Sequence, residues 1–220
     1  MASLPIEFEA GDAEAARVAL AKGGVDICLL DGALPDDDKA GVVRSARRIK
    51  TSAPLVLLTS ARGKALDNID GVLPPPPDAA EARKSIEICI RARMPTQVLI
   101  ASGSDALRGI LRKILQASRF GLDIDEAADS AATLARLVRS SIGMVFLDAA
   151  MPGLNGVDTL MAIKRQNPNV RIALMASAVG KTPAGRGRLA GVIVLKKPFY
   201  QADIDAVLKR YYGLHASEAS

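Results

Sequence analysis

The chain has 220 residues, of which 49% are hydrophobic, 24% charged and 3% aromatic, and its net charge is +5. No apolar run reaches the roughly 18 residues of a membrane-spanning helix, and the N-terminus lacks the basic and apolar segments of a secretory signal. The two cysteines have no metal-ligand spacing, and His215 is the only histidine. These features exclude membrane, secreted, disulfide-stapled and zinc-finger classes, and we expect a cytoplasmic protein.

Short apolar runs alternate with amphipathic stretches along the first part of the chain. The apolar runs lie at 25–30, 55–58 and 72–73, and an amphipathic stretch at 78–93 ends before Met94-Pro95. Continuous apolar runs of this length are typical of strands that are buried on both faces of a parallel sheet. The three consecutive acids at 36–38 are expected to form a solvated turn.

The same alternation continues in the second part. Apolar runs lie at 98–100, 143–147, 172–176 and 192–195, and helical stretches at 132–138 and 157–163 lie between them. One further helix is predicted from a single apolar stripe at helical spacing, formed by Leu107, Ile110, Leu111, Ile114 and Leu115. Alternating strands and helices with short joints predict right-handed crossovers and doubly wound parallel sheets, an α/β fold.

An internal repeat divides the chain. Residues 6–64 align with residues 123–181 at a fixed offset of 117 without gaps, and the identical pairs include Asp12/Asp129, Asp31/Asp148 and Pro35/Pro152. Such an alignment predicts one fold used twice. We therefore expect domains at 1–95 and 96–220. The second has a strand and a helix at 98–120 before the repeated region, and the first lacks this opening strand and helix.

An aspartate follows an apolar run in both copies of the repeat, and a proline follows four residues later. The segments read LDGALP at 30–35 and LDAAMP at 147–152. The carboxyl end of a parallel strand faces the crevice where such sheets bind ligands, and a carboxylate there can attack a phosphoryl group. The alternative is an aspartate that only caps the turn after the strand.

The chain resembles two receiver domains of bacterial two-component response regulators in tandem. In the second unit the resemblance extends over about 97–211, and it rests on VFLDAAMPGLNG around Asp148 and LKKPF around Lys197. It implies flavodoxin-like domains in which Asp148 takes a phosphoryl group from a kinase histidine and Lys197 pairs with the phosphoryl oxygens. An ammonium beside a carboxylate lowers the carboxylate's pKa and stabilises added negative charge.

Both units depart from the receiver pattern. The resemblance implies two adjacent Mg2+-binding acids after the first strand, where this chain reads Ala-Ser-Gly-Ser at 101–104. Only Asp148 is left as a metal ligand, so we expect Mg2+ binding to be weak or lost. The hydroxyl position falls on Ala176, with Ser177 adjacent. In the first unit Asp31 and Thr59 match the acid and hydroxyl positions, whereas the lysine position falls within the prolines at 74–77.

We expect a binding module, not an enzyme: a two-component signalling protein without an output domain in these residues, which contacts a histidine kinase or a downstream signalling protein and forms a homodimer. The alternative is a working phosphoacceptor with Asp148 as nucleophile, Lys197 as charge partner and Ser177 in the hydroxyl role. Hydrolysis of phosphate esters is disfavoured because Ala33 and Ala150 stand where a second acid would protonate the leaving group.

Basic residues gather in the second half of the chain. Residues 96–220 carry 16 lysines and arginines against 10 acids, a net charge of +6. In receiver domains the last strand and helix form a partner-binding face, and the basic residues on or near it here are Arg186, Arg188, Lys196, Lys209 and Arg210. A basic half can also attract nucleic acid, but no recognition helix is apparent, so we do not expect DNA binding.

Overall fold

The computed structural model describes residues 7, 9, 11–50, 53–60, 66–154, 156–177 and 191–214. It divides the chain into two compact units, the first formed by residues 1–85 and 214–220 and the second by residues 86–213. Each unit contains its own parallel sheet. The predicted α/β fold with two parallel sheets is thus confirmed, while the predicted domain boundary at 95/96 stays a prediction.

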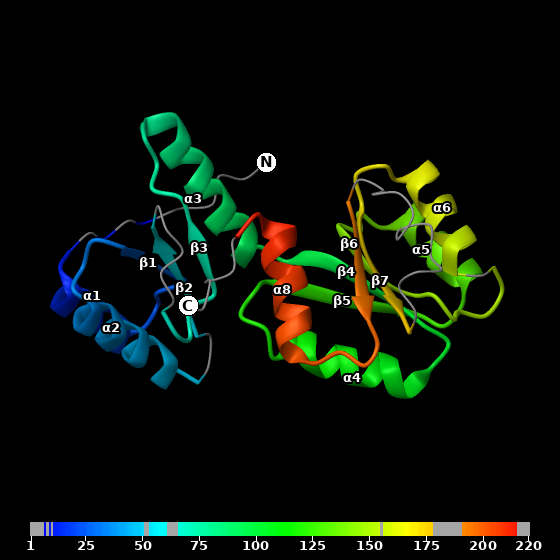
Figure 1. Ribbon diagram of the computed structural model, residues 1–220, viewed down its shortest axis with the longest axis horizontal. Coiled ribbons are helices and arrows are strands. Elements are labelled where there is room, and N and C mark those ends of the chain that lie inside the picture. The colour runs from blue at the N-terminus through cyan, green and yellow to red at the C-terminus, as the bar shows by residue number, and fades with distance from the viewer. Residues whose placement is uncertain are drawn as a thin grey trace. The chain divides into compact units, whose positions relative to one another are not determined.

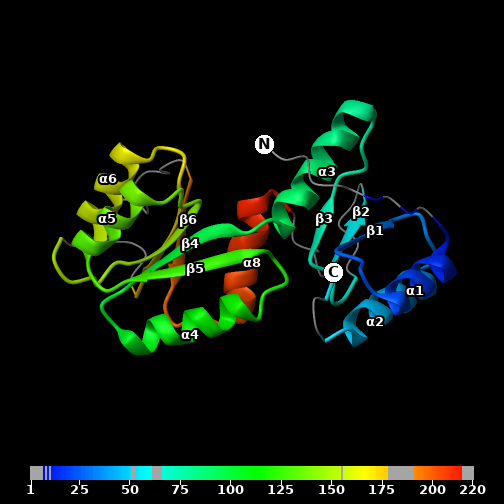
Figure 2. The ribbon, with the colours of Figure 1, turned by 180° about the vertical axis from the view of Figure 1, so that it is seen from behind.

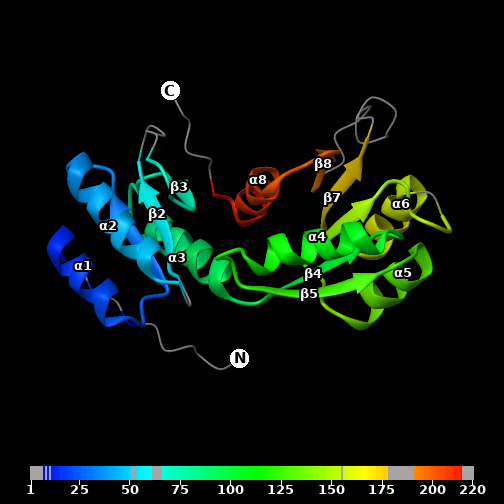
Figure 3. The same cartoon turned by 90° about the horizontal axis from the view of Figure 1, so that it is seen from below.

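The second unit has a five-stranded parallel sheet in the order β5-β4-β6-β7-β8. Its strands are β4 (Thr96–Ala101), β5 (Leu122–Ala127), β6 (Met144–Asp148), β7 (Arg171–Ala176) and β8 (Val192–Lys196). Its helices are α4 (Asp105–Gln116), α5 (Ser130–Arg139), α6 (Gly156–Gln166) and α8 (Gln201–Tyr212). Helices α4 and α8 lie on one face of the sheet and α5 and α6 on the other, which is a doubly wound arrangement (Figure 1, Figure 3).

The central strands of this sheet are buried because helices cover both faces. All five residues of β6 are buried, and one core cluster joins alternate residues of β4, β6 and β7, including Leu99, Leu147 and Leu174, to the apolar faces of α5 and α6. The predicted stripe on α4 is only partly buried, since Leu111 and Leu115 are enclosed whereas Ile110 is 54% exposed.

Strand β5 was not predicted, and its composition explains why. Three of its six residues are acidic, so the sequence lacks the apolar run that marks the other strands. It lies at the edge of the sheet and pairs only with β4, as the view from behind shows (Figure 2). Charged residues are common on edge strands, where they protect the open edge from further pairing.

The first unit has a three-stranded parallel sheet in the order β1-β2-β3, with β1 (Ile27–Asp31), β2 (Leu55–Thr59) and β3 (Gly71–Leu73). Its helices α1 (Ala13–Lys22) and α2 (Asp36–Arg48) lie side by side and enclose a core with one face of the sheet, while α3 (Ala79–Arg93) supplies residues to both units. The described residues of this unit contain no strand that corresponds to β4, and the loss of the opening strand stays a prediction.

The internal repeat appears in the elements themselves. At the offset of 117, α1 coincides with α5 and β1 coincides with β6. The identity of Asp12 and Asp129 has a physical reason, because each caps its helix by accepting a hydrogen bond from the backbone N–H three residues on, at 2.8 and 2.7 Å. Such caps stabilise a helix by about 1 kcal/mol.

The acidic triplet at 36–38 differs from its prediction. These three residues form the first turn of α2, where their charges complement the positive end of the helix dipole. The expectation of a turn outside any helix is therefore wrong. Pro35 is the N-cap residue of this helix, and its ring fixes φ at −53°, close to the helical value.

A buried ion pair holds the loops of the first unit together. Arg47 of α2 donates to Asp70 Oδ2 at 2.7 Å and to the backbone oxygens of Asn68 and Pro54. Asp70 Oδ2 also accepts from the N–H of Val56 at 2.8 Å. Both charged groups are thus hydrogen-bonded, which offsets part of the cost of burying them.

Candidate functional site

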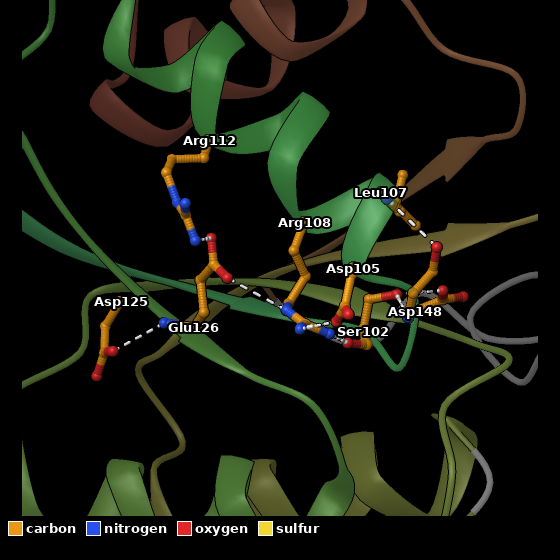
Figure 4. Close-up of polar contacts among 9 residues, drawn as sticks. Ser102, Asp105, Leu107, Arg108, Arg112, Asp125, Glu126 and Asp148 are labelled. Atoms are coloured by element: carbon orange, nitrogen blue, oxygen red, sulfur yellow. Dashed lines mark hydrogen bonds and ion pairs between the residues drawn. The ribbon is translucent and has the colours of Figure 1, made fainter.

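Two polar side chains meet at the carboxyl end of the second unit's sheet. Strands β4 and β6 are neighbours but not consecutive, so the chain leaves them toward opposite faces and opens a crevice at their ends. Asp148 is the last residue of β6, and Ser102 directly follows β4. The Ser102 hydroxyl donates a hydrogen bond to Asp148 Oδ2 at 2.8 Å, and both side chains are buried (Figure 4).

Both carboxylate oxygens of Asp148 are engaged. Oδ1 accepts from Lys197 Nζ at 2.6 Å and from the N–H of Ala150 at 3.0 Å, and Oδ2 accepts from Ser102. Burial alone raises the pKa of Asp148, but the hydrogen bonds from Lys197, Ala150 and Ser102 and the charge of Lys197 outweigh it. The pKa therefore lies below its ordinary value, and the side chain is a carboxylate at neutral pH.

Lys197 is positioned by the sheet. It follows β8, and its backbone N–H donates to the carbonyl of Ala176 at the end of β7 at 2.9 Å. Its ammonium reaches across to Asp148 and keeps 24% of the side chain exposed. The structure therefore places the Lys197 ammonium against the Asp148 carboxylate, as the resemblance to receiver domains implies.

The predicted hydroxyl position differs from the rest of the site. Ala176 is buried at the end of β7, and Ser177 follows it with an exposed side chain. Among the contacts of the described residues, none joins Ser177 to Asp148. The structure therefore brings Asp148 and Lys197 together and leaves Ser177 apart from them.

The donor set around Asp148 does not fit a magnesium ion. Mg2+ takes octahedral oxygen ligands with one or two carboxylates and several waters. Here the Asp148 oxygens already accept from an ammonium, a hydroxyl and an amide, and the described residues contain no group of three acidic, histidine or cysteine side chains that could hold a metal. The nearby Asp105 has a side chain that is 91% exposed and pairs with Arg108 in the first turn of α4.

Sequence analysis missed the role of Ser102 and its neighbour Arg108. Arg108 donates to the backbone oxygen of Ser102 at 2.6 Å and to Glu126 at 3.2 Å, and Glu126 also pairs with Arg112 (Figure 4). Arg108 thereby ties α4 to β5 and to the end of β4. The sequence does place Ser102 at the end of a predicted strand. A single serine there does not indicate which side chain it contacts.

The turn after β4 leaves no room for a side chain at Gly103. A Cβ at this position would meet Pro152 Cδ at 2.5 Å. Pro152 belongs to the motif that follows Asp148, so the two loops that border the crevice pack directly on each other. A residue larger than glycine at 103 requires the Pro152 loop to move.

The matching residues of the first unit are arranged differently. Asp31 ends β1 and accepts from the N–H of Ala33 at 2.8 Å, as Asp148 does from Ala150, but Asp31 is exposed. The Thr59 hydroxyl donates to the carbonyl of Leu30 at 3.2 Å. The prolines at 74–77 follow β3 and offer no ammonium. Sequence analysis missed the buried Lys39, which donates to the carbonyl of Gly32 at 3.0 Å.

The strand that ends in the aspartate is more exposed in the first unit than in the second. Ile27, Leu29 and Asp31 occupy the repeat positions of Met144, Phe146 and Asp148. The latter three are 0%, 0% and 4% exposed, whereas Leu29 is 47% exposed. The described residues of the first unit form no counterpart of β4 and α4, and in the second unit β4 lies beside β6.

Parts of the predicted partner-binding face lie outside the described residues. These are Arg186 and Arg188, whereas Lys196 is exposed at the end of β8. Lys209 and Arg210 lie in the last turn of α8.

Among the described residues, no helix combines the length and apolar composition that crossing a membrane requires.

The second unit is thus a doubly wound α/β domain with a buried carboxylate and an ammonium at the carboxyl end of its sheet. A family model described as the response regulator receiver domain matches residues 98–209, about half of the chain. The chain belongs to this family, whose members are receiver domains of two-component signalling. The predicted receiver identity is confirmed for the second unit, while the family model does not extend to the first.

Several proteins are similar to this chain over part of their length. A protein-glutamate methylesterase/protein-glutamine glutaminase from Treponema denticola is 33% identical over 82 residues, which cover 37% of this chain and 22% of that protein. The transcriptional regulatory protein YrkP from Bacillus subtilis is 29% identical over 123 residues, 54% of this chain and 52% of YrkP. The chain therefore spans about a fifth of the length of the first relative and about half of the length of the second. Protein PilG from Pseudomonas aeruginosa is 25% identical, with 86% of its length covered.

Solved structures are similar to about half of the chain. The receiver domain of a sensor histidine kinase from Pseudomonas aeruginosa PAO1, described with a magnesium ion coordinated in its active site cleft, is 19% identical, with a TM-score of 0.47 over 54% of this chain and 98% of that one. A CheX–CheY complex with BeF3 and magnesium from Borrelia burgdorferi gives 24% identity and a TM-score of 0.49 over 54% of this chain and 90% of that one.

Proposed function

We propose that this chain is a two-component signalling protein built from tandem receiver-like units, that it acts through protein contacts and not as an enzyme, and that Mg2+-dependent phosphorylation of Asp148 is weak or absent. The observation that carries the proposal is the hydrogen bond between Ser102 and Asp148 at 2.8 Å. A neutral hydroxyl stands beside the phosphoacceptor position where a metal site needs a second carboxylate, and a lone carboxylate does not offset the dehydration of Mg2+.

The receiver identity of the first unit is part of this proposal. Its support is the coincidence of α1 with α5 and of β1 with β6 at one offset, and the matching turn after Asp31 and Asp148. In the first unit the aspartate at the matching position, Asp31, is exposed, and prolines occupy the lysine position. It therefore serves as a binding surface and not as a phosphoacceptor.

The test is to incubate the full chain with acetyl phosphate at increasing Mg2+ concentrations and to measure the added phosphoryl mass by mass spectrometry. We expect less than about a tenth of the protein to be labelled at any Mg2+ concentration. Stoichiometric labelling that requires Mg2+ and disappears in Asp148→Asn would overturn the proposal. Asp31→Asn is the matched variant in the first unit and is expected to label like the wild type.

A second candidate function, phosphorylation of Asp148 by a histidine kinase, is favoured by the Lys197–Asp148 pair. The low pKa keeps Asp148 ionised, and an ionised oxygen can attack the phosphorus of a phosphohistidine while the N–P bond breaks and the leaving imidazole takes up a proton. The Lys197 ammonium would then pair with the oxygens of the phosphoryl group on Asp148. The same labelling experiment distinguishes this function from the first.

The predicted homodimer is tested separately, by sedimentation velocity of the chain with and without the phosphoryl label.

A further inference from the structure

A pocket lies in the second unit, at the end of the sheet opposite to the Asp148 crevice. It is bordered by the residues at which strands begin: Thr96 starts β4, Gly143 precedes β6, and Arg171 starts β7. Its volume is about 450 Å³, which falls in the range of small-molecule sites. The receiver chemistry described above uses only the carboxyl end of the sheet, so this pocket has no role in it.

The pocket is rich in positive charge. Arg91 of α3 and Arg171 line it, and no aspartate or glutamate is among the lining residues. Within the described part of the chain, neither arginine forms an ion pair with a carboxylate. Lys164 lies close to Arg171, and burial together with the charge of Arg171 lowers the pKa of Lys164. Repulsion between cations that have no counter-ion is unfavourable, and an anion in the pocket relieves it.

An aromatic wall stands beside these arginines. Tyr211 and Tyr212 of α8 both line the pocket and meet edge to face, with ring centroids 4.8 Å apart. Tyr212 is fixed, because its ring stacks on Phe120 and its hydroxyl donates to Thr96 Oγ1 at 2.9 Å. Burial raises the pKa of Tyr212 to about 12, so it stays protonated. Tyr211 is half-buried and presents the accessible ring of the pair.

Gly143 gives Tyr211 its position. A Cβ on Gly143 would lie 2.5 Å from the Tyr211 hydroxyl oxygen and 3.2 Å from Thr96 Cγ2. The tyrosine hydroxyl thus rests on bare backbone at the floor of the pocket. Gly143→Ala displaces the ring without changing any charge, which makes it a useful probe.

We propose that this pocket binds a nucleotide, with its phosphate between Arg91 and Arg171 and its base against Tyr211. Guanidinium groups match phosphate oxygens with paired N–H donors, and a nucleotide base stacks favourably on a tyrosine ring. The combination of uncompensated arginines and a fixed aromatic pair fits a ligand that is anionic at one end and planar at the other. Neither a free phosphate nor a neutral nucleoside uses both halves of the pocket.

The experiment is isothermal titration of the full chain with AMP, and separately with adenosine and with inorganic phosphate. We expect saturable AMP binding that is at least tenfold tighter than binding of either fragment. The double variant Arg91→Gln/Arg171→Gln should weaken AMP binding tenfold or more, and Tyr211→Leu and Gly143→Ala should weaken it severalfold. The control Arg139→Gln/Arg165→Gln removes two exposed charges from the same unit outside the pocket and should change the affinity less than twofold.

Three results would overturn the proposal: no binding of AMP, equal affinity for AMP and inorganic phosphate, or an equal loss in the control and the pocket variants. Thermal unfolding of every variant verifies that it is folded at the titration temperature. The outcome is independent of Asp148, and Asp148→Asn should bind AMP as the wild type does. Failure here therefore leaves the proposed receiver function untouched, and the reverse also holds.

Discussion

Lys197 Nζ lies 2.6 Å from Asp148 Oδ1, although the two residues are 49 positions apart in the chain. The contact joins the end of β6 to the segment after β8, two strands away across β7. The sheet thus brings a carboxylate and an ammonium together before any phosphoryl group is present. This preformed pair allows the charges of the site to be tested in the resting protein.

Replacement of Lys197 by methionine should leave the buried Asp148 without its main partner. We expect the free energy of unfolding at pH 7 to fall by about 1–3 kcal/mol, the usual cost of an unsatisfied buried group. Because Asp148 has a depressed pKa in the folded state, its stabilisation is present above the unfolded pKa of about 3.9 and is lost as the pH falls through the folded value.

The difference between Lys197→Met and the wild type should therefore shrink below about pH 4, when Asp148 takes up a proton. Guanidinium unfolding at a series of pH values measures it. Lys196→Met removes the same charge from the exposed neighbour and should cost little at any pH. A pH-independent deficit in Lys197→Met would show that the lysine stabilises the fold by packing alone.

Ser102→Asp should create a metal site. The new carboxylate would stand within hydrogen-bonding distance of Asp148, and two such charges repel unless a cation lies between them. We expect the variant to be less stable than the wild type without metal and to gain several degrees in Tm with millimolar Mg2+, whereas the wild type gains little. Differential scanning fluorimetry measures both.

The matched control for this prediction is Ser104→Asp, two residues further on. Ser104 is exposed and caps α4 by accepting a hydrogen bond from Leu107, a role that aspartate also performs. It should show no Mg2+ response. Equal responses in Ser102→Asp and Ser104→Asp would mean that any added acid attracts the ion and that the crevice plays no part.

Much of the fold follows from the sequence, because buried strands require apolar runs and the repeat is gapless. The elements that the sequence did not predict include α1, α2 and β5. In β5 and in the first turn of α2 the acidic residues stay partly or fully exposed, so no apolar pattern marks these segments. In the site, the aspartate and lysine were found by their motifs. The contact between Ser102 and Asp148 was not predicted, because it requires β4 and β6 to be neighbours in the sheet. Local sequence patterns do not determine the order of strands in a sheet.

Arg47→Met should destabilise the first unit. The substitution removes the Arg47 guanidinium from the buried Asp70 carboxylate, and breaking a buried pair in this way costs about 3–5 kcal/mol. Hydrogen exchange followed by mass spectrometry should show faster exchange in β2 and β3, with β4 and β6 unchanged. Arg48→Met, the exposed neighbour, should leave exchange in both sheets as in the wild type.

The repeat allows one further pair of variants to be compared. Phe146→Ala empties a fully buried position and should cost about 3–5 kcal/mol, whereas Leu29→Ala at the equivalent position should cost less than about 1 kcal/mol. Urea unfolding measures both. A large loss for Leu29→Ala would mean that this residue is covered in solution, for example by self-association, and its concentration dependence would reveal that.

The outer side of β1 pairs with no described strand, so its peptide groups face outward beside the uncovered Leu29. Peptide groups arranged in this way are where sheets grow from one molecule to the next. Aspartates at both ends of the strand, Asp26 and Asp31, place like charges together when identical copies stack. In concentrated solution the double variant Asp26→Asn/Asp31→Asn should therefore be less soluble than the wild type.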